Sequence, residues 1–295
     1  MDDGDWLTET FEQHRSRLRA VAYRMLGSVG EADDALQEAW LRVTAAGADD
    51  VENIGAWLTT VVARVCLNLL RARRNRREDP LDVHVPDPIV SPESGVDPEH
   101  EALLADSVGL ALMVVLDLLA PAERLAFVLH DMFAVPYDEI APMIDRTPAA
   151  ARQLASRARR RVQGEAPAPD PDTDRQQEVV QAFFAATRDG DFEALVALLD
   201  PDVVFRSDGG ARSRFTIRLS GARTVADQTL TSANSQLLPY LRPALVNGAA
   251  GVVVAVPARP LYVMGFTVVD GRIAAIDVLA DPDRLADLDL SAINR

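Results

Sequence analysis

The sequence predicts a multidomain protein with two all-α domains followed by an α+β domain. Apolar residues recur at helical intervals through most of residues 6–162. Two proline-rich stretches, 78–98 and 165–174, interrupt that pattern and are typical of extended linkers. After the second stretch, two helical segments are followed by short runs typical of strands. The length of 295 residues leaves room for two or three domains.

Composition indicates a soluble cytoplasmic protein. No uninterrupted apolar run reaches about 18 residues, so no membrane span is expected. The acidic N-terminal segment MDDGDWLTETFEQ lacks the pattern of a signal peptide. The single cysteine, Cys66, excludes an internal disulfide and a cysteine-based zinc site, and the 4 histidines are dispersed. We therefore expect no metal site and no cofactor, and no P-loop or dinucleotide fingerprint is present.

The charge distribution is more informative than the total. A net charge of −15 by itself argues against a nucleic-acid partner. However, residues 64–77 and 146–162 each contain six arginines and no acidic residue. All basic residues of the chain are arginine, so the use of arginine alone carries no information about function. The sequence thus combines two local basic segments with an acidic chain.

Three helices are predicted in the first domain. The first covers residues 6–25 and ends before the glycines at 27 and 30. The second, 31–43, has an apolar side and an opposite side that is acidic and rich in amides. The third, 54–77, begins near Trp57 and has arginines crowded at its end.

The second domain is predicted to contain helices over 99–119 and 121–133 and then a helix-turn-helix over 134–162. Pro136 and Pro148 suit first helical turns, Thr147 is a good N-cap, and Asp145-Arg146 forms the turn. In the last helix small apolar residues share one face, whereas arginine and amide side chains occupy the other. That pattern suits a DNA major groove, although an ordinary amphipathic surface helix remains the alternative.

The third domain is predicted to be α+β. Helices over 176–188 and 192–199 precede six strands, at 203–206, 214–219, 241–246, 252–256, 261–269 and 273–278. Asp270-Gly271 is a strong hairpin signal, and residues 257–260 would form a second hairpin turn. The order of helices followed by strands favours a curved antiparallel sheet covered by helices.

Three stretches together resemble an extracytoplasmic-function sigma factor of the sigma-70 family. Residues 22–28 with 31–43 resemble the core of sigma region 2, and 56–61 leading into 68–71 resemble its promoter-melting helix. Residues 127–162 resemble sigma region 4. The resemblance covers about residues 6–164 in the right order, and it implies core RNA polymerase and promoter DNA as partners.

The resemblance implies three groups of site residues. Those expected to dock on RNA polymerase are Asp33, Asp34, Gln37 and Glu38. Those expected at the −10 element are Trp57, Arg64, Asn68, Arg71, Arg73, Arg74 and Arg77. Those expected at the −35 element are Arg146, Arg152, Gln153, Ser156, Arg157 and Arg160.

The third domain resembles the SnoaL-like, polyketide-cyclase-type cone-shaped barrel that is fused to one group of these sigma factors. That group carries a linker motif close to Trp-Leu-Pro-Glu-Pro and a domain motif Asp-Gly-Gly-Gly-Lys. The corresponding residues here are His84, Val85, Pro86, Asp87 and Pro88 in the linker, and Asp208, Gly209, Gly210, Ala211 and Arg212 in the domain. The resemblance implies that the barrel grips the linker and regulates the factor in cis, without a dedicated anti-sigma factor.

The expected domains are therefore region 2 at 1–77, a linker at 78–98, region 4 at 99–164, a linker at 165–174 and a SnoaL-like domain at 175–295.

Two alternatives remain. A ligand-responsive helix-turn-helix regulator would leave the acidic helix and the Trp57 helix without a role. A working cyclase or isomerase would need an acid or base such as Asp208 in a cavity, which the aromatic residues of the domain could line. Simple packing of those aromatic residues in the core is the more economical interpretation. We expect no enzymatic activity, whereas a small-molecule ligand in this domain stays open.

Overall fold

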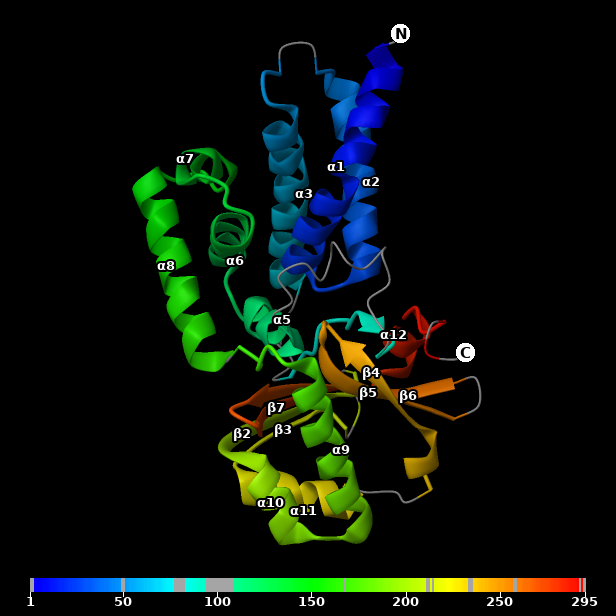
Figure 1. Ribbon diagram of the computed structural model, residues 1–295. Helices are drawn as coiled ribbons and strands as arrows, with labels where there is room; N and C mark the ends of the chain where they lie inside the picture. Colours follow the sequence, from blue (N-terminus) through cyan, green and yellow to red (C-terminus); the bar gives the residue numbers. More distant parts are fainter. Residues whose placement is uncertain are drawn as a thin grey trace. The chain divides into compact units, whose positions relative to one another are not determined.

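The computed structural model describes residues 3–48, 51–76, 83–93, 109–166, 168–210, 213, 215–232, 236–256, 259–291 and 293 (Figure 1). The chain forms two compact units. A helical unit comprises residues 1–80, 98–106 and 115–165, and a second unit comprises 81–97, 107–114 and 166–295. Residues 81–97 thus belong to the same unit as the C-terminal domain. The five segments expected from the sequence, with their boundaries, stay a prediction.

Three long helices begin the helical unit: α1 (Asp3–Leu26), α2 (Val29–Ala46) and α3 (Ile54–Arg76). They lie side by side, as expected from the apolar periodicity (Figure 1). Ser28 caps α2 by accepting a hydrogen bond from the backbone N–H of Glu31. Phe11 of α1 packs against Trp40 of α2, with ring centroids 4.9 Å apart. Apolar faces of all three helices therefore meet in one core.

Helix α3 is apolar enough to be mistaken for a membrane span. Its residues Ile54–Arg74 have a mean hydropathy of 1.3 and sufficient length. Leu58, Val62 and Cys66, however, are fully buried against the neighbouring helices. Burial also raises the pKa of the Cys66 thiol to about 12, so this group stays protonated. These are the properties of the core helix of a bundle.

The second part of the helical unit contains α6 (Pro121–Phe127), a π-helical turn η1 (Val128–Met132), α7 (Tyr137–Ile140), a 3₁₀ turn η2 (Ala141–Met143) and α8 (Pro148–Glu165). The helix expected over 121–133 therefore changes to π geometry in its second half. Asp145 makes the expected turn with φ 55°, a left-handed conformation that aspartate tolerates. Thr147 caps α8 by accepting from the N–H of Ala150.

A curved seven-stranded sheet forms the second unit, in the order β1-β4-β5-β6-β7-β2-β3. The strands are β1 (Val90–Ser91), β2 (Leu199–Asp208), β3 (Ile217–Ser220), β4 (Leu241–Val246), β5 (Ala249–Val256), β6 (Arg259–Val269) and β7 (Arg272–Leu279). The six expected strands are present, and both expected hairpins, β5–β6 and β6–β7, are confirmed.

The sheet is mixed, and the expectation of a purely antiparallel sheet is wrong. Strand β2 pairs in parallel with β7, with Phe205 opposite Ile276. These strands are separated by more than sixty residues of chain, so no local turn signal sets their relative direction. Strand β1 comes from the stretch predicted as a linker, and pairs antiparallel with β4.

Helices α9 (Thr173–Asp189), α10 (Phe192–Leu198) and α11 (Ala222–Ser232) pack on the sheet. Phe183 of α9, Leu195 of α10 and Val225 of α11 share a core with Phe266 and Ile276 of the sheet. The periodicity of the sequence did not reveal α11. The remaining described elements are α5 (Gly109–Asp117), η3 (Leu238–Tyr240) and α12 (Pro282–Ala286).

A buried arginine joins the two parts of the helical unit. Arg124 of α6 is 1% exposed and its Nε donates to the carbonyl of Arg24, 3.0 Å away in the last turn of α1. Helix carbonyls at that end lack intrahelical partners, so a cation there is favourable. The Nη1 atom donates to Asp117 at 3.0 Å, whereas Nη2 has no hydrogen-bond partner in the described structure. Burial lowers the pKa of the guanidinium and the charge of Asp117 opposes that shift.

We predict that Arg124→Ala lowers the free energy of unfolding of the helical unit by about 3–5 kcal/mol, because it leaves Asp117 and a helix terminus unpaired. All 3 tryptophans lie in this unit, so tryptophan fluorescence during urea unfolding measures the loss. Arg15→Ala is the matched control, since its ion pair with Glu12 is about half exposed and should cost no more than about 1 kcal/mol. Equal losses in the two variants would contradict this view of Arg124.

Candidate functional site

Helix α8 presents the residues expected at the −35 element on an exposed face. Arg152, Gln153 and Arg157 are exposed, whereas Ala151, Ala155 and Ala158 are fully buried on the opposite side. Local contacts hold several members of the predicted set in place. The guanidinium of Arg152 lies over the ring of Tyr137, 5.4 Å from its centroid, and Arg160 and Arg146 donate to nearby backbone carbonyls. Ser156 is half-buried.

Helix α3 brings Arg64, Asn68 and Arg71 onto one exposed stripe. Arg74 is also exposed, and Trp57 is half-buried near the start of the helix. Arg64 donates to the carbonyl of Pro142 at 3.4 Å, which joins this stripe to the turn before α8.

Arg73 differs from the rest of the predicted set, since it is paired with Glu31 and donates to the carbonyl of Leu26 at 3.2 Å. Arg77 lies outside the described residues.

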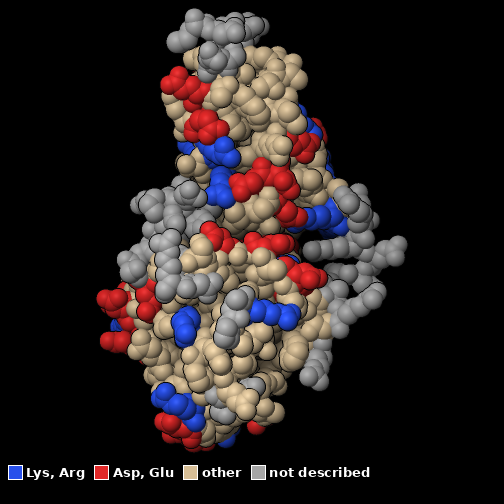
Figure 2. Space-filling view, turned by 90° about the vertical axis from the view of Figure 1, so that its right-hand side faces the viewer, with Lys and Arg blue, Asp and Glu red and all other residues tan. Residues whose placement is uncertain are grey.

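Helix α2 carries the predicted docking residues. Two of the acids are paired: Asp33 accepts a bidentate pair of hydrogen bonds from Arg19 at 2.7 and 2.8 Å, and Glu38 pairs with Arg42. Asp34 and Gln37 are exposed, and the same side of the helix exposes Leu41, 62% accessible. On the face seen in Figure 2, basic and acidic side chains lie next to one another over the helical unit. The exposed part of the acidic face thus centres on Asp34 and Gln37.

The linker and the C-terminal domain meet at the carboxylate of Asp208, at the end of β2. Its Oδ2 accepts from the backbone N–H of Val85 at 3.0 Å and lies 3.2 Å from Nδ1 of His84. Its Oδ1 accepts from the N–H of Gly210 at 3.0 Å. Asp208 is 1% exposed, and Val85 is fully buried. A buried carboxylate thus holds the backbone of the linker directly.

Arg284 of α12 completes this arrangement. Its Nη1 donates to Asp208 at 2.8 Å, its Nε to Asp87 at 2.7 Å, and its Nη2 to the carbonyl of Val85 at 2.5 Å. One guanidinium therefore contacts two carboxylates and the linker backbone. We call this group of residues the linker clasp: His84, Val85, Asp87, Asp208 and Arg284.

Electrostatics stabilise the ionised form of the linker clasp. Burial alone would raise the pKa of Asp208. The hydrogen bonds from His84, Val85 and Gly210 and the charge of Arg284 act in the opposite direction and lower that pKa to about 2. The carboxylate therefore remains charged throughout the physiological pH range, which makes it a permanent acceptor for the linker.

A second contact holds the linker at Ile89, two residues after Asp87. Ile89 donates its N–H to Oδ1 of Asn247 at 3.1 Å and accepts from the N–H of Asn247 at 2.8 Å. Val90 and Ser91 then pair with Val246 and Leu245 as β1 and β4. Pro86 and Pro88 are buried along the same path. The proline-rich stretch described here is therefore a packed part of the second unit.

Two glycines shape the loop after Asp208. Gly210 has φ 90°, and a Cβ there would lie 2.6 Å from a carboxylate oxygen of Asp281. A Cβ on Gly209 would lie 2.5 Å from the hydroxyl oxygen of Ser213. Both positions thus exclude larger residues in this conformation. Arg212, also predicted for this loop, lies outside the described residues.

Sequence reasoning missed Arg284 and Asn247 as site residues. Arg284 sits in the segment Asp281-Pro282-Asp283-Arg284, where it is a single base among acids. That contrast is a signal that could have singled it out. Asn247-Gly248 reads only as a turn, with φ 50° at Asn247, and nothing local shows that its side chain would bond a residue 158 positions away.

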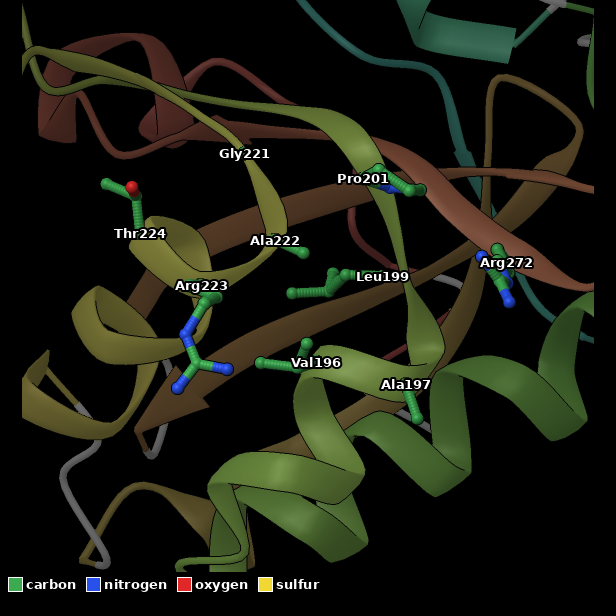
Figure 3. Close-up of a pocket in the computed structure, with 9 residues that line it drawn as sticks. All are labelled: Val196, Ala197, Leu199, Pro201, Gly221, Ala222, Arg223, Thr224 and Arg272. Carbon is green, nitrogen blue, oxygen red and sulfur yellow. The ribbon is translucent and has the colours of Figure 1, made fainter.

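Two of the hollows in the described part of the second unit bear on the alternatives. An aromatic cavity of about 390 Å³ is lined by Phe183, Phe184, Phe205 and Tyr262, among others. Phe266 instead packs in the core. A depression of about 480 Å³ lies between α10, α11 and β2, with Arg223 and Arg272 at opposite ends (Figure 3). None of the predicted site residues lines the depression. No group of three or more potential metal ligands occurs in the described part of the chain.

Comparisons with known proteins agree with this geometry. Residues 10–76 match the family model for sigma-70 region 2, and residues 109–162 match that for sigma-70 region 4. The ECF RNA polymerase sigma factor SigJ of Mycobacterium tuberculosis is 37% identical over 286 residues, 93% of this chain and 91% of the relative. The probable sigma factor SigI of the same species is 34% identical over 98% of both chains.

The crystal structure of Mycobacterium tuberculosis SigJ superposes with a TM-score of 0.77 at 36% identity, and covers 96% of this chain and 99% of that one. The likeness therefore includes the α+β domain and its sheet. It also decides against a separate helix-turn-helix regulator, which would not share region 2, region 4 and the whole domain order. The chain belongs to the extracytoplasmic-function sigma factors, transcription factors that direct RNA polymerase to promoters and initiate transcription.

Proposed function

We propose that the C-terminal domain regulates this sigma factor in cis by holding the linker between its two promoter-reading regions. The observation that carries the proposal is the linker clasp, in which Asp208 and Arg284 bind the linker at Val85 and Asp87. A protein that reads two DNA elements needs a defined relation between its readers. Gripping the connecting chain couples the state of the domain to promoter binding.

The proposal assigns the regulation to the chain itself. No dedicated anti-sigma factor is needed if a fused domain already controls the linker, and a small molecule bound in that domain would supply the signal. The partners of the sigma regions are core RNA polymerase and promoter DNA, which places the protein in the cytoplasm.

Residue roles on the sigma regions follow from exposure and charge. We assign Arg152, Gln153 and Arg157 on α8 to the −35 element, because an exposed face of guanidinium and amide groups can reach base edges and phosphates. We assign the exposed stripe of Arg64, Asn68 and Arg71 on α3 to the −10 element. Arg73 can join it only after it leaves Glu31. Asp34 and Gln37 are assigned to docking on polymerase.

We predict that substitution of the linker clasp alters transcription. Asp208→Ala removes the acceptor of the Val85 N–H and the partner of Arg284, so promoter-dependent transcript yield with purified core polymerase should change by about fivefold or more. The double variant Asp87→Ala, Arg284→Ala should have a similar effect, because it breaks the same contact from the other side. Asp283→Ala, an exposed acid beside Arg284, is the control. Unchanged yield in both clasp variants would refute regulation through the linker.

Arg157→Ala should weaken binding of the polymerase holoenzyme to promoter DNA by about 1–3 kcal/mol if this side chain contacts a base. The loss should depend on the −35 sequence, because a base contact gives specificity whereas a phosphate contact does not. Fluorescence anisotropy with native and scrambled −35 elements separates the two cases. Arg15→Ala, on α1, is the control. An equal affinity for the native element in Arg157→Ala and the unaltered protein would remove Arg157 from the interface.

Asp34→Arg should lower the affinity for core RNA polymerase by about tenfold or more, since a reversed charge in a complementary interface costs several kcal/mol. Surface plasmon resonance with immobilised core enzyme provides the measurement. Glu12→Arg on α1 makes the same change of charge at an exposed acid and should bind as the unaltered protein does. Comparable losses for both variants would show only a general electrostatic effect, and would count against a docking role for Asp34.

A further inference from the structure

Strand β2 carries two functional sets of side chains on its two faces. Successive strand residues point to opposite sides of a sheet. Phe205 and Ser207 line the aromatic cavity, whereas Arg206 pairs with Asp277 and Asp208 belongs to the linker clasp. Ser207, in the cavity wall, therefore directly precedes the carboxylate that holds the linker. A movement of this end of the strand would therefore displace side chains on both faces of the sheet.

The aromatic cavity has the size and chemistry of a small-molecule site. Its volume of about 390 Å³ falls within the usual range for ligand pockets. Besides the four aromatic residues named above, it is lined by Phe215, Met264 and aliphatic side chains, with Gln228 and Ser207 among its few polar groups. None of the described residues that line it is Asp, Glu, Arg or Lys. A cavity without a charged group favours an uncharged ligand.

The hydroxyl of Ser207 points to a polar feature of that ligand. Ser207 is 7% exposed, and its side chain makes no hydrogen bond within the described structure. Because Ser207 lines the cavity, its hydroxyl can donate a hydrogen bond to a molecule bound there or accept one from it. A ligand oxygen or N–H beside Ser207 would satisfy it. The occupant that fits is therefore a neutral, mostly apolar molecule with at least one hydrogen-bonding group.

The loop after β2 links the cavity to the linker clasp. The hydroxyl of Thr216 accepts from the N–H of Gly209 at 3.2 Å and donates to the carbonyl of Gly210 at 2.8 Å. Its neighbour Phe215 lines the cavity and is 49% exposed. Gly210 in turn donates to Asp208. A ligand that covers Phe215 would thus act on a loop that is hydrogen-bonded to the clasp.

We propose that the C-terminal domain is a sensor, in which a neutral, mostly apolar small molecule binds in the aromatic cavity and changes the hold of the linker clasp on residues 83–91. The proposal rests on the proposed regulation through the linker, and it names the site, the class of signal and the route. By linkage, a ligand that alters the clasp must itself bind with a different affinity when the clasp is broken.

The first experiment measures binding of the neutral dye Nile red to the full-length protein by fluorescence. We expect saturable binding at one site, weakened about fivefold or more by Phe215→Ala, which removes wall area at an exposed position without disturbing the core. Arg223→Ala, in the other depression, is the matched control and should leave the affinity unchanged (Figure 3). No saturable binding, or equal effects of the two substitutions, would overturn the cavity assignment.

The second experiment tests the coupling. Asp208→Ala should change the affinity for Nile red by about fivefold, and saturating dye should change hydrogen exchange of the Val85 and Ile89 amides in the unaltered protein by a corresponding factor. An unchanged dye affinity in Asp208→Ala would overturn the sensor. Transcription by the same variant separates the two ideas. Altered transcription with unaltered dye affinity would support regulation in cis and contradict the sensor. Altered dye affinity with unaltered transcription would show that the cavity is coupled to the linker clasp but does not control transcription.

Discussion

The buried carboxylate of Asp208 is the interaction on which the second unit depends. A charged group that is 1% exposed is tolerated only when its oxygens are well bonded. The donors come from three distant parts of the chain: the linker at His84 and Val85, the loop at Gly210, and Arg284 near the C-terminus. Removing the linker would leave both Asp208 and Arg284 short of partners. The linker is therefore a structural part of the C-terminal domain.

Because of this arrangement, the connection between the two sigma regions is a held segment and not a free linker. A free proline-rich segment would permit a broad range of separations between the readers. Residues 83–91 instead follow a defined path, held by the linker clasp at one end and by Asn247 and the β1–β4 pairing at the other. Under the proposed regulation, the domain that grips the segment would set the freedom of the readers and would do the work of a separate regulatory protein.

The helical unit uses charge in two different ways. On α8 the small buried residues leave guanidinium groups at the surface, as a DNA-reading face requires. At the junction of α6 and α1, Arg124 is instead buried and caps a helix end. Arginine number alone does not distinguish these roles in a chain whose basic residues are all arginine. Burial distinguishes them, because a desolvated guanidinium needs fixed partners and an exposed one remains available for phosphate.

The sequence by itself determined most of the helices, the helix-turn-helix and the hairpins, since periodicity, Thr147 and Asp270-Gly271 act on neighbouring residues. The family motifs also located Asp208 and the linker as partners. Only the tertiary structure decided the parallel pairing of β2 with β7, the buried path of the linker, and the roles of Arg124, Asn247 and Arg284. Arg284 and Asp87 are 197 residues apart, and no local pattern encodes such a contact. Their pairing follows from the fold, which brings Asp87 of the linker and Asp208 of β2 to the same guanidinium.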